Sequence, residues 1–147
     1  MNRLLFAGTV LVAGLLASPA VVAAQAPSTS IPATPADAAP FLGDWTLTLQ
    51  GPNGPGNFDL TVKVEDQKVV GEIAIPTGEM PKNFIPDVAM NAKTMELRYT
   101  FDYQGNSVPA VVSLTPAADG KINAQIDFAG GAYLMTGTAA KKAAVKQ

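Results

Sequence analysis

The sequence predicts an all-β domain over residues 41–140, an antiparallel up-and-down β-barrel of about eight strands. Apolar and polar side chains alternate with a period of two through almost all of this region. Clusters rich in Gly, Pro and Asn, such as residues 51–56, separate the alternating segments. Each segment therefore has one apolar face. A meander buries these faces best by closing on itself, which also leaves no unpaired strand edge. A two-sheet β-sandwich is the alternative.

The predicted strands form one meander, because short links make each strand pair antiparallel with the one before it. The strands cover residues 45–50, 57–65, 69–75, 84–90, 94–103, 107–115, 121–128 and 132–138. The first begins at Trp45, the only tryptophan, and the fifth alternates most regularly. The fourth contains Pro86 and the sixth contains Pro109. Since proline cannot donate a ladder hydrogen bond, we expect an edge or a bulge at both places.

The clearest strands each have a defined apolar face. In chain order these faces carry Trp45, Leu47 and Leu49; Phe58, Leu60, Val62 and Val64; Ile73 and Ile75; Met95, Leu97, Tyr99, Phe101 and Tyr103; and Ile122, Ala124, Ile126 and Phe128. No segment of the domain has a convincing helical period.

The first 24 residues predict a secretory signal peptide. Arg3 supplies the positive charge, and residues 4–16 form an uncharged apolar stretch that Ser18-Pro19 interrupts. Small residues place the cleavage after Ala24 or after Ala26. We therefore expect export to the periplasm or the extracellular space, without stable membrane insertion once the signal is cleaved. An uncleaved anchor is the alternative.

Two further segments flank the predicted domain. Residues 25–40 are rich in Pro, Ala, Ser and Thr and are expected to form a disordered or extended linker. Residues 141–147 contain three lysines and are expected to form a basic, disordered tail. The expected division is signal peptide 1–24, linker 25–40, β-barrel 41–140 and tail 141–147.

The composition excludes several kinds of chemistry. The chain has no Cys and no His, so it forms no disulfide, no Ser-His-Asp or Cys-His catalytic group and no His/Cys zinc site. Between residues 41 and 138, six basic residues stand against eleven acidic ones, which argues against nucleic-acid binding. No phosphate loop or nucleophile motif is present. We expect a protein that is not an enzyme and that holds no metal and no cofactor, and we leave its protein partners open.

The tripeptide Gly43-Asp44-Trp45 carries a resemblance to a known group. A Gly-x-Trp at the start of the first strand of a soluble meander resembles the calycins, which include lipocalins, fatty-acid-binding proteins and avidins. The resemblance implies a barrel with an apolar ligand inside, and a Trp at one end beside an Arg near the last strand. Here that place offers only Lys141 and Lys142, which lack the plane of a guanidinium.

The chain resembles more closely a class of small exported bacterial β-domains. The shared features are the Gly-x-Trp opening, a Gly-Glu such as Gly78-Glu79, and a glycine-rich last hairpin such as Gly130-Gly131. Domains of this class have no settled activity, so the resemblance implies a fold and no reaction.

The barrel interior is the first candidate site. Following the calycin resemblance, its candidate ligand-binding residues are Trp45, Phe58, Tyr99, Phe101, Tyr133 and Met135. The alternative is that they form a packed core, because an eight-stranded barrel is only just wide enough to hold one small ligand. The tyrosine hydroxyls either orient a ligand or bond to the backbone.

The loop over residues 76–84 is the second candidate, for contact with a partner. It brings together Glu79, Met80, Lys82 and Phe84. Exposed Met and Phe beside charges indicate a contact patch. The alternative is a turn whose apolar residues fold back onto the end of the barrel.

Overall fold

A computed structural model describes residues 30–78 and 80–143. Within them lie one antiparallel sheet and three short helical segments. In chain order the elements are β1 (Ile31–Pro32), α1 (Pro35–Ala38), the 3₁₀ turn η1 (Ala39–Phe41), β2 (Gly43–Gly51), β3 (Gly54–Glu65), β4 (Lys68–Ala74), β5 (Asn83–Ile85), β6 (Asp87–Asn91), β7 (Thr94–Tyr103), β8 (Asn106–Pro116), the 3₁₀ turn η2 (Ala118–Gly120), β9 (Ile122–Phe128) and β10 (Tyr133–Lys141).

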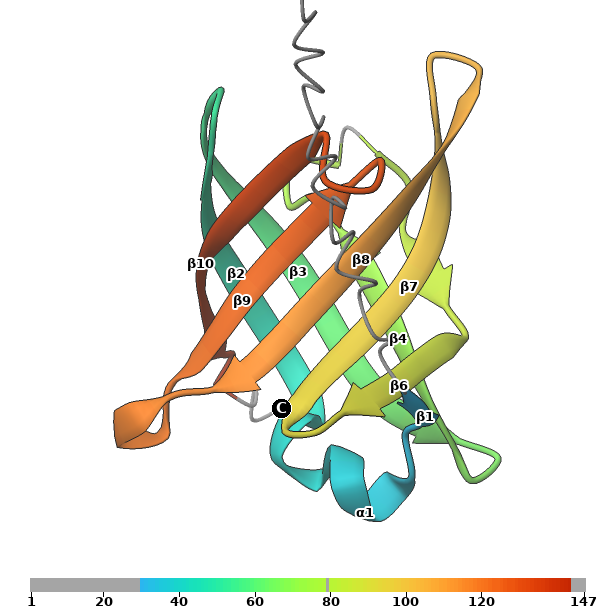
Figure 1. Cartoon of the computed structure of the whole chain (residues 1–147), viewed down its shortest axis with the longest axis vertical. Coiled ribbons are helices and arrows are strands. Elements are labelled where there is room, and N and C mark those ends of the chain that lie inside the picture. The colour runs from blue at the N-terminus through green and yellow to red at the C-terminus, as the bar shows by residue number, and fades with distance from the viewer. Residues whose placement is uncertain (1–29, 79, 144–147) are drawn as a thin grey trace, which may run out of the picture.

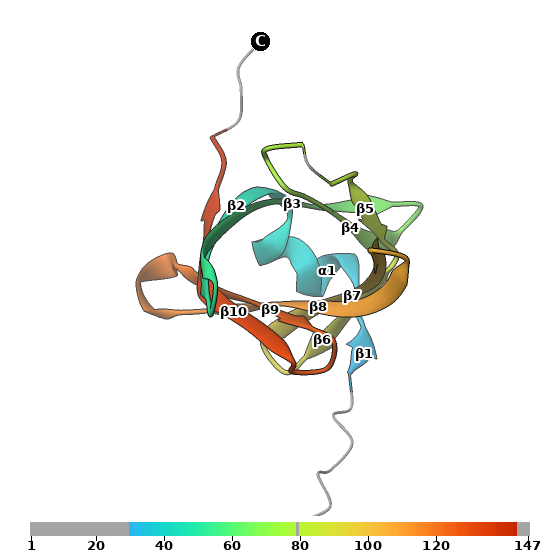
Figure 2. The ribbon, with the colours of Figure 1, turned by 90° about the horizontal axis from the view of Figure 1, so that it is seen from above.

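The sheet curls around on itself into a barrel-like wall (Figures 1 and 2). Its strand order is β1-β6-β7-β8-β9-β10-β2-β3-β4-β5. The last strand lies beside the first long one, with Lys141 of β10 paired to Trp45 of β2. β5 pairs with β4 and β6 pairs with β7, yet only Pro86 separates β5 from β6 in the chain. The two flanks of the sheet therefore meet at Pro86.

The all-β prediction is confirmed, but the sheet has ten strands and not about eight. Seven predicted strands are present with ends shifted by at most three residues. The predicted fourth strand, 84–90, is divided into β5 and β6 because Pro86 has no N–H to continue a ladder. β1 is the other added strand. All strands of the described residues belong to one sheet, so the two-sheet sandwich is not the architecture.

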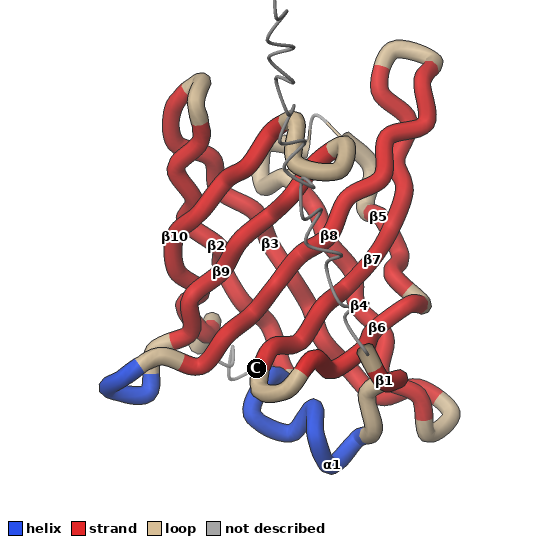
Figure 3. Tube along the Cα trace, in the orientation of Figure 1, coloured by secondary structure: helices blue, strands red, loops and turns tan. Residues whose placement is uncertain are grey.

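Residues 30–41 fold across one end of the sheet, where a linker up to residue 40 was expected (Figure 3). β1 pairs with β6 through Ile31 and Met90. α1 begins where a helix N-terminus is favoured, because Thr34 Oγ1 accepts a hydrogen bond from Asp37 N at 3.2 Å and the following proline needs no N–H partner. The rest of the predicted linker and the predicted signal peptide lie outside the described residues.

Composition alone did not identify the packing of this segment. Ala38 is 0% exposed and Phe41 is 2% exposed, so both belong to the core. We refer to this end of the sheet as the plugged end, defined by Ala38 and Phe41. Within residues 30–78 and 80–143, no helix is long and apolar enough to cross a membrane.

The predicted basic tail also begins inside the fold. Lys141 ends β10, and Lys142 forms an ion pair with Asp59 at 2.8 Å. The backbone N–H of Lys142 donates to the carbonyl of Asp44, also at 2.8 Å. The tail prediction therefore differs from the structure at its first two residues, and residues 144–147 lie outside the description.

The core is filled unevenly along the strands. On β2, the inward side chains of Trp45, Leu47 and Leu49 are 6%, 0% and 1% exposed, and then Gly51 follows with no side chain. β7 starts with the fully buried Met95 and Leu97, continues with half-buried aromatic residues and ends at Tyr103, which is 56% exposed. Packing is therefore complete at the plugged end and incomplete at the other.

Candidate ligand pocket

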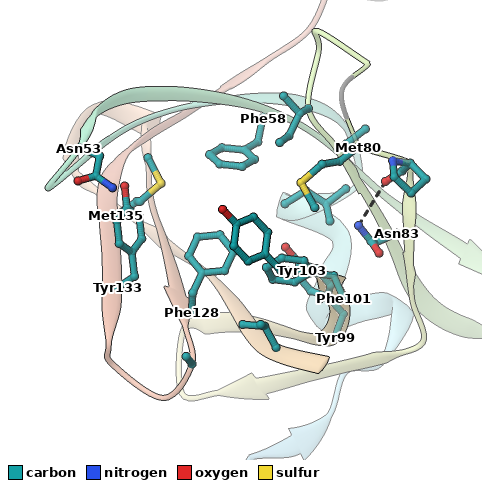
Figure 4. A pocket seen from close by; sticks show the side chains of 16 residues that line it. Asn53, Phe58, Met80, Asn83, Tyr99, Phe101, Tyr103, Phe128, Tyr133 and Met135 are labelled. Atoms are coloured by element: carbon teal, nitrogen blue, oxygen red, sulfur yellow. Dashed lines mark hydrogen bonds between the residues drawn. The ribbon is translucent and has the colours of Figure 1, made fainter. Parts of the chain in front are cut away.

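An apolar pocket of about 450 Å³ lies at the end of the sheet opposite α1 (Figure 4). We refer to this end as the open end, defined by the turns between β2 and β3, β7 and β8, and β9 and β10. One wall is aromatic and is formed by Tyr99, Phe101, Tyr103, Phe128 and Tyr133. Across from it lie Phe58 and Met80, and Ile73, Ile75 and Pro81 also line the pocket. The volume falls within the range of small-molecule sites.

Four rings of the aromatic wall form a continuous series. The ring centroids of Tyr99 and Phe101 are 6.1 Å apart, those of Phe101 and Phe128 are 5.7 Å apart, and those of Phe128 and Tyr133 are 6.0 Å apart. The middle pair is edge-to-face, at 79°, an arrangement favoured by the ring quadrupoles. The small Ala110 of β8 pairs with both Tyr99 and Phe128, and this leaves room for rings from β7 and β9 to approach.

Two glycines shape the wall near Tyr133. A Cβ at Gly56 would lie 2.8 Å from Met135 Cε, and a Cβ at Gly51 would lie 3.0 Å from Met135 Cγ. The thioether of Met135 therefore occupies the space that side chains at these positions would need. Because Met has three rotatable side-chain bonds, this part of the wall adapts to shape more easily than a branched side chain would.

The tyrosine hydroxyls at the pocket have no partners among its lining residues. Figure 4 marks one hydrogen bond there, from Asn83 Nδ2 to the carbonyl of Pro81 at 3.3 Å. No fully buried polar side-chain atom of the described residues lacks a partner, so the free hydroxyls of Tyr99, Tyr103 and Tyr133 retain access to solvent or to the pocket. Burial raises the pKa of Tyr99 from 10.0 to about 12, so its hydroxyl remains a hydrogen-bond donor at neutral pH.

The plugged end is built differently around Trp45. Its Nε1–H donates to the carbonyl of Phe41 at 2.7 Å, and the ammonium of Lys141 lies 5.6 Å from its ring centroid. Gly43 has a φ of 119°, and a Cβ there would lie 2.9 Å from Lys141 Cε. The glycine of the Gly-x-Trp tripeptide thus leaves room for the lysine that covers the tryptophan.

Five of the six predicted lining residues meet at the pocket, and Trp45 does not. The five are Phe58, Tyr99, Phe101, Tyr133 and Met135. Trp45 lies at the plugged end, about 20 Å along β2 from Gly51 at ~3.4 Å per residue. The inference that inward aromatics share one cavity fails at this position, because Trp45 is buried in the core at the plugged end and its N–H is bonded to the carbonyl of Phe41.

The described residues of the predicted contact loop are divided among different surroundings. Met80 lines the pocket, while Lys82 lines a separate polar groove of about 230 Å³ together with Asp44 and Asp59. Phe84 is 52% exposed. Glu79 lies outside the described residues.

Sequence reasoning missed Tyr103 and Phe128 as lining residues. Both occupy inward positions in the predicted alternation of their strands, so the signal was present. Asn53 and Asn83 also line the pocket. They lie in a turn and in a short strand, where alternation gives no indication of facing.

Comparison with profiles of protein families, with curated proteins and with solved structures finds no match to this chain.

Proposed function

We propose that the protein is an exported, non-catalytic β-barrel of calycin-like kind that binds a small apolar or amphipathic molecule at its open end. The observation that carries this proposal is the pocket of about 450 Å³, in which the rings of Tyr99 and Phe101 remain half-buried. Filling this space with side chains would increase the stability of the fold, because atoms that line a void lose dispersion contacts. A pocket that stays unfilled therefore favours a role in binding. An apolar concavity with a few polar groups is the usual form of a small-molecule site.

The calycin-like part of the proposal is supported at the plugged end. Trp45 lies under a cation from the last strand, the place where the calycin resemblance implies an arginine. Lys141 supplies that cation here, with a point charge instead of a planar group.

The alternative is a structural or interaction domain that acts through its surface. It is favoured by the filled layers between the two ends, where Leu47, Leu97 and Ile126 are each 0% exposed. On this alternative, the pocket is only the unfilled mouth of a packed barrel.

Ligand binding is tested with protein purified without denaturation. Native mass spectrometry detects a retained molecule, and thermal melting with a panel of fatty acids, retinoids and aromatic compounds detects added ones, because a ligand that binds only the folded state raises Tm. Trp45 emission is a poor reporter, because the ring lies at the plugged end. A panel that leaves both the mass and the Tm unchanged supports the alternative.

A matched pair of variants locates the binding on the pocket. Gly56→Val places a branched side chain against Met135 and Phe58 without a positive φ to strain it. Asn57→Val makes the same residue at the next position of β3, which is exposed. We expect Gly56→Val to abolish the ligand-induced rise in Tm and Asn57→Val to retain it. Equal responses of the two variants would place any binding elsewhere.

Export is tested at the N-terminus of the mature protein. Ser30, whose Oγ accepts a hydrogen bond from Arg98 Nη2 at 2.8 Å, follows both predicted cleavage sites, Ala24 and Ala26. Cleavage at either site keeps every described contact. N-terminal sequencing of protein from the periplasm or the medium should begin at Gln25 or at Pro27, and an intact Met1 would contradict export.

A broad hydrolase screen tests the non-catalytic part of the proposal, and turnover of any substrate would overturn that part.

A further inference from the structure

The described lining of the pocket contains no charged side chain. Lys82 is in the neighbouring loop, but it lines the separate polar groove beside Asp44 and Asp59. A charged ligand group in the pocket would therefore lose hydration without gaining an opposite charge from the described lining, and such burial is strongly unfavourable.

The depth of the pocket is limited. Below the aromatic wall, Leu49 and Leu60 are each 1% exposed and Leu97 is 0% exposed, so the next layer is closed. The volume of about 450 Å³ equals that of roughly 15 molecules of liquid water. These dimensions suit a compact molecule better than an extended acyl chain.

The aromatic wall favours flat rings over a point cation. An aromatic cage for ammonium groups directs several ring faces at one centre. Here neighbouring rings follow one another along three strands, tilted by 37° between Tyr99 and Phe101 and by 79° between Phe101 and Phe128. Such a row presents both the edges and the faces of its rings to the pocket. A planar ring system can make stacked or edge-to-face contacts with several of them.

The polar groups at the pocket indicate which hydrogen-bonding atom the ligand should carry. The hydroxyls of Tyr99 and Tyr103 have no partner among the described residues of the lining, so a ligand in the pocket can accept a hydrogen bond from them. Of the two, Tyr99 lies deeper, since it is half-buried whereas Tyr103 is 56% exposed. A ligand that displaces water from the Tyr99 hydroxyl must replace its hydrogen bond, which requires an acceptor atom.

We propose that the ligand is an uncharged, compact molecule that contains a flat aromatic ring system and a hydrogen-bond acceptor for Tyr99. This inference rests on the proposed function and narrows it, since amphipathic anions such as fatty acids are then excluded from the ligands of this pocket.

The inference is tested by calorimetric titration of four probes of similar size. The probes are 2-acetylnaphthalene, which is neutral with an acceptor; 2-naphthoate, an anion; 2-naphthylmethylammonium, a cation; and 2-dodecanone, which is neutral with an acceptor but has no ring. We expect 2-acetylnaphthalene to bind at least about tenfold more tightly than each of the others, because each of them lacks a required property.

Variants test whether the Tyr99 hydroxyl donates a hydrogen bond to the ligand. Tyr99→Phe should weaken 2-acetylnaphthalene binding by about 2- to 12-fold, the range for one neutral hydrogen bond. It should leave 2-ethylnaphthalene, which has no acceptor, unaffected. Thr100→Val, which removes an exposed hydroxyl from the outer face of β7 beside Tyr99, is the control and should alter neither. The four-probe titration is repeated with Glu79→Gln, because Glu79 lies next to Met80 in the sequence but outside the described residues.

The outcomes separate this inference from the proposed function. Tighter or equal binding of the anion, the cation or 2-dodecanone overturns the inference, and a cation preference that Glu79→Gln removes overturns it as well. Equal loss of 2-acetylnaphthalene and 2-ethylnaphthalene in Tyr99→Phe also overturns the role of its hydroxyl. If no naphthalene probe binds while another member of the ligand panel does, the inference fails and the proposed function stands. If nothing binds, both fail.

Discussion

At the plugged end, the indole of Trp45 is 6% exposed and its N–H is held by the carbonyl of Phe41. At the open end, the phenol of Tyr103 is 56% exposed, and its hydroxyl has no partner among the described residues that line the pocket. The same sheet thus packs aromatic rings in one place and presents them in another. The difference arises because residues 30–41 return over one end of the curled sheet and no corresponding described segment fills the other.

The largest expected effect is the loss of the plugged-end tryptophan. Trp45→Ala should lower the free energy of unfolding by about 3–5 kcal/mol, because it removes a buried ring and its hydrogen bond. Phe101→Ala at the open end should cost less than about 2 kcal/mol, because that ring is only half-buried. Urea unfolding measures both. Equal losses would mean that the two ends do not differ in packing.

The next effect concerns the joint between β10 and β2. A Cβ at Gly137 would lie 2.0 Å from the carbonyl oxygen of Thr48, and a backbone atom cannot move aside as a side chain does. Gly137→Ala should therefore cost about 3 kcal/mol or more. Gly56→Ala, whose Cβ meets the flexible end of Met135 most closely and the ring edge of Phe58 at 3.2 Å, should cost about 1 kcal/mol or less. A reversed order would contradict the greater adaptability assigned to the pocket wall.

A smaller effect is expected at the lysine over the tryptophan. Lys141→Met keeps an aliphatic stem and removes the charge, so it should cost about 0.5–1 kcal/mol, the usual strength of an exposed cation–π contact. Lys141→Arg should retain the stability. Lys121→Met is the control at an exposed lysine and should change the stability by less than about 0.5 kcal/mol. If Lys141→Met matches that control, the cation does not stabilise the plugged end.

A further effect is a dependence on alkaline pH at the open end. The folded-state pKa of Tyr99 is about 12, above its ordinary 10.0, so an unfolded chain ionises this group first. The contribution is complete below pH 10 and decreases as pH rises towards 12. Wild type should therefore lose more stability over this interval than Tyr99→Phe does. The comparison is needed because Lys63, whose pKa is raised by hydrogen bonds to Glu65 and Glu72, also contributes to the dependence on alkaline pH, and does so in both proteins. Parallel pH profiles would contradict the burial of the Tyr99 hydroxyl.

Most of the sheet could be predicted from the sequence, because alternation reports directly which side of a strand faces inward. The predicted strand 94–103 coincides with β7, and its inward residues end at the pocket. Pro86 also indicated an irregularity within the predicted strand 84–90, and the structure shows that it divides this strand into β5 and β6. The alternation of apolar and polar residues was sufficient to predict features that depend on one strand alone.

The parts that could not be predicted depend on contacts between distant segments. Ala38 and Phe41 follow a Pro- and Ala-rich stretch whose composition predicts disorder, and only the opening at the end of the curled sheet gives them a place to pack. Trp45 has the same alternation as Phe101, yet only one of them is covered. Alternation specifies the inward face but not the depth along the axis, so the candidate lining included one residue from the wrong end.

The pairing of β10 with β2 has a consequence for how the chain folds. Trp45 and Lys141 are neighbours in the sheet although almost the whole domain separates them in the sequence. Contacts of this kind raise the contact order and slow folding, because a long loop must be closed before the pairing contributes. Until residues 133–141 have been synthesised, β2 and β9 each lack a partner along one edge. A growing chain that still lacks β10 therefore cannot complete this sheet, and it exposes strand edges that can aggregate until β10 is added.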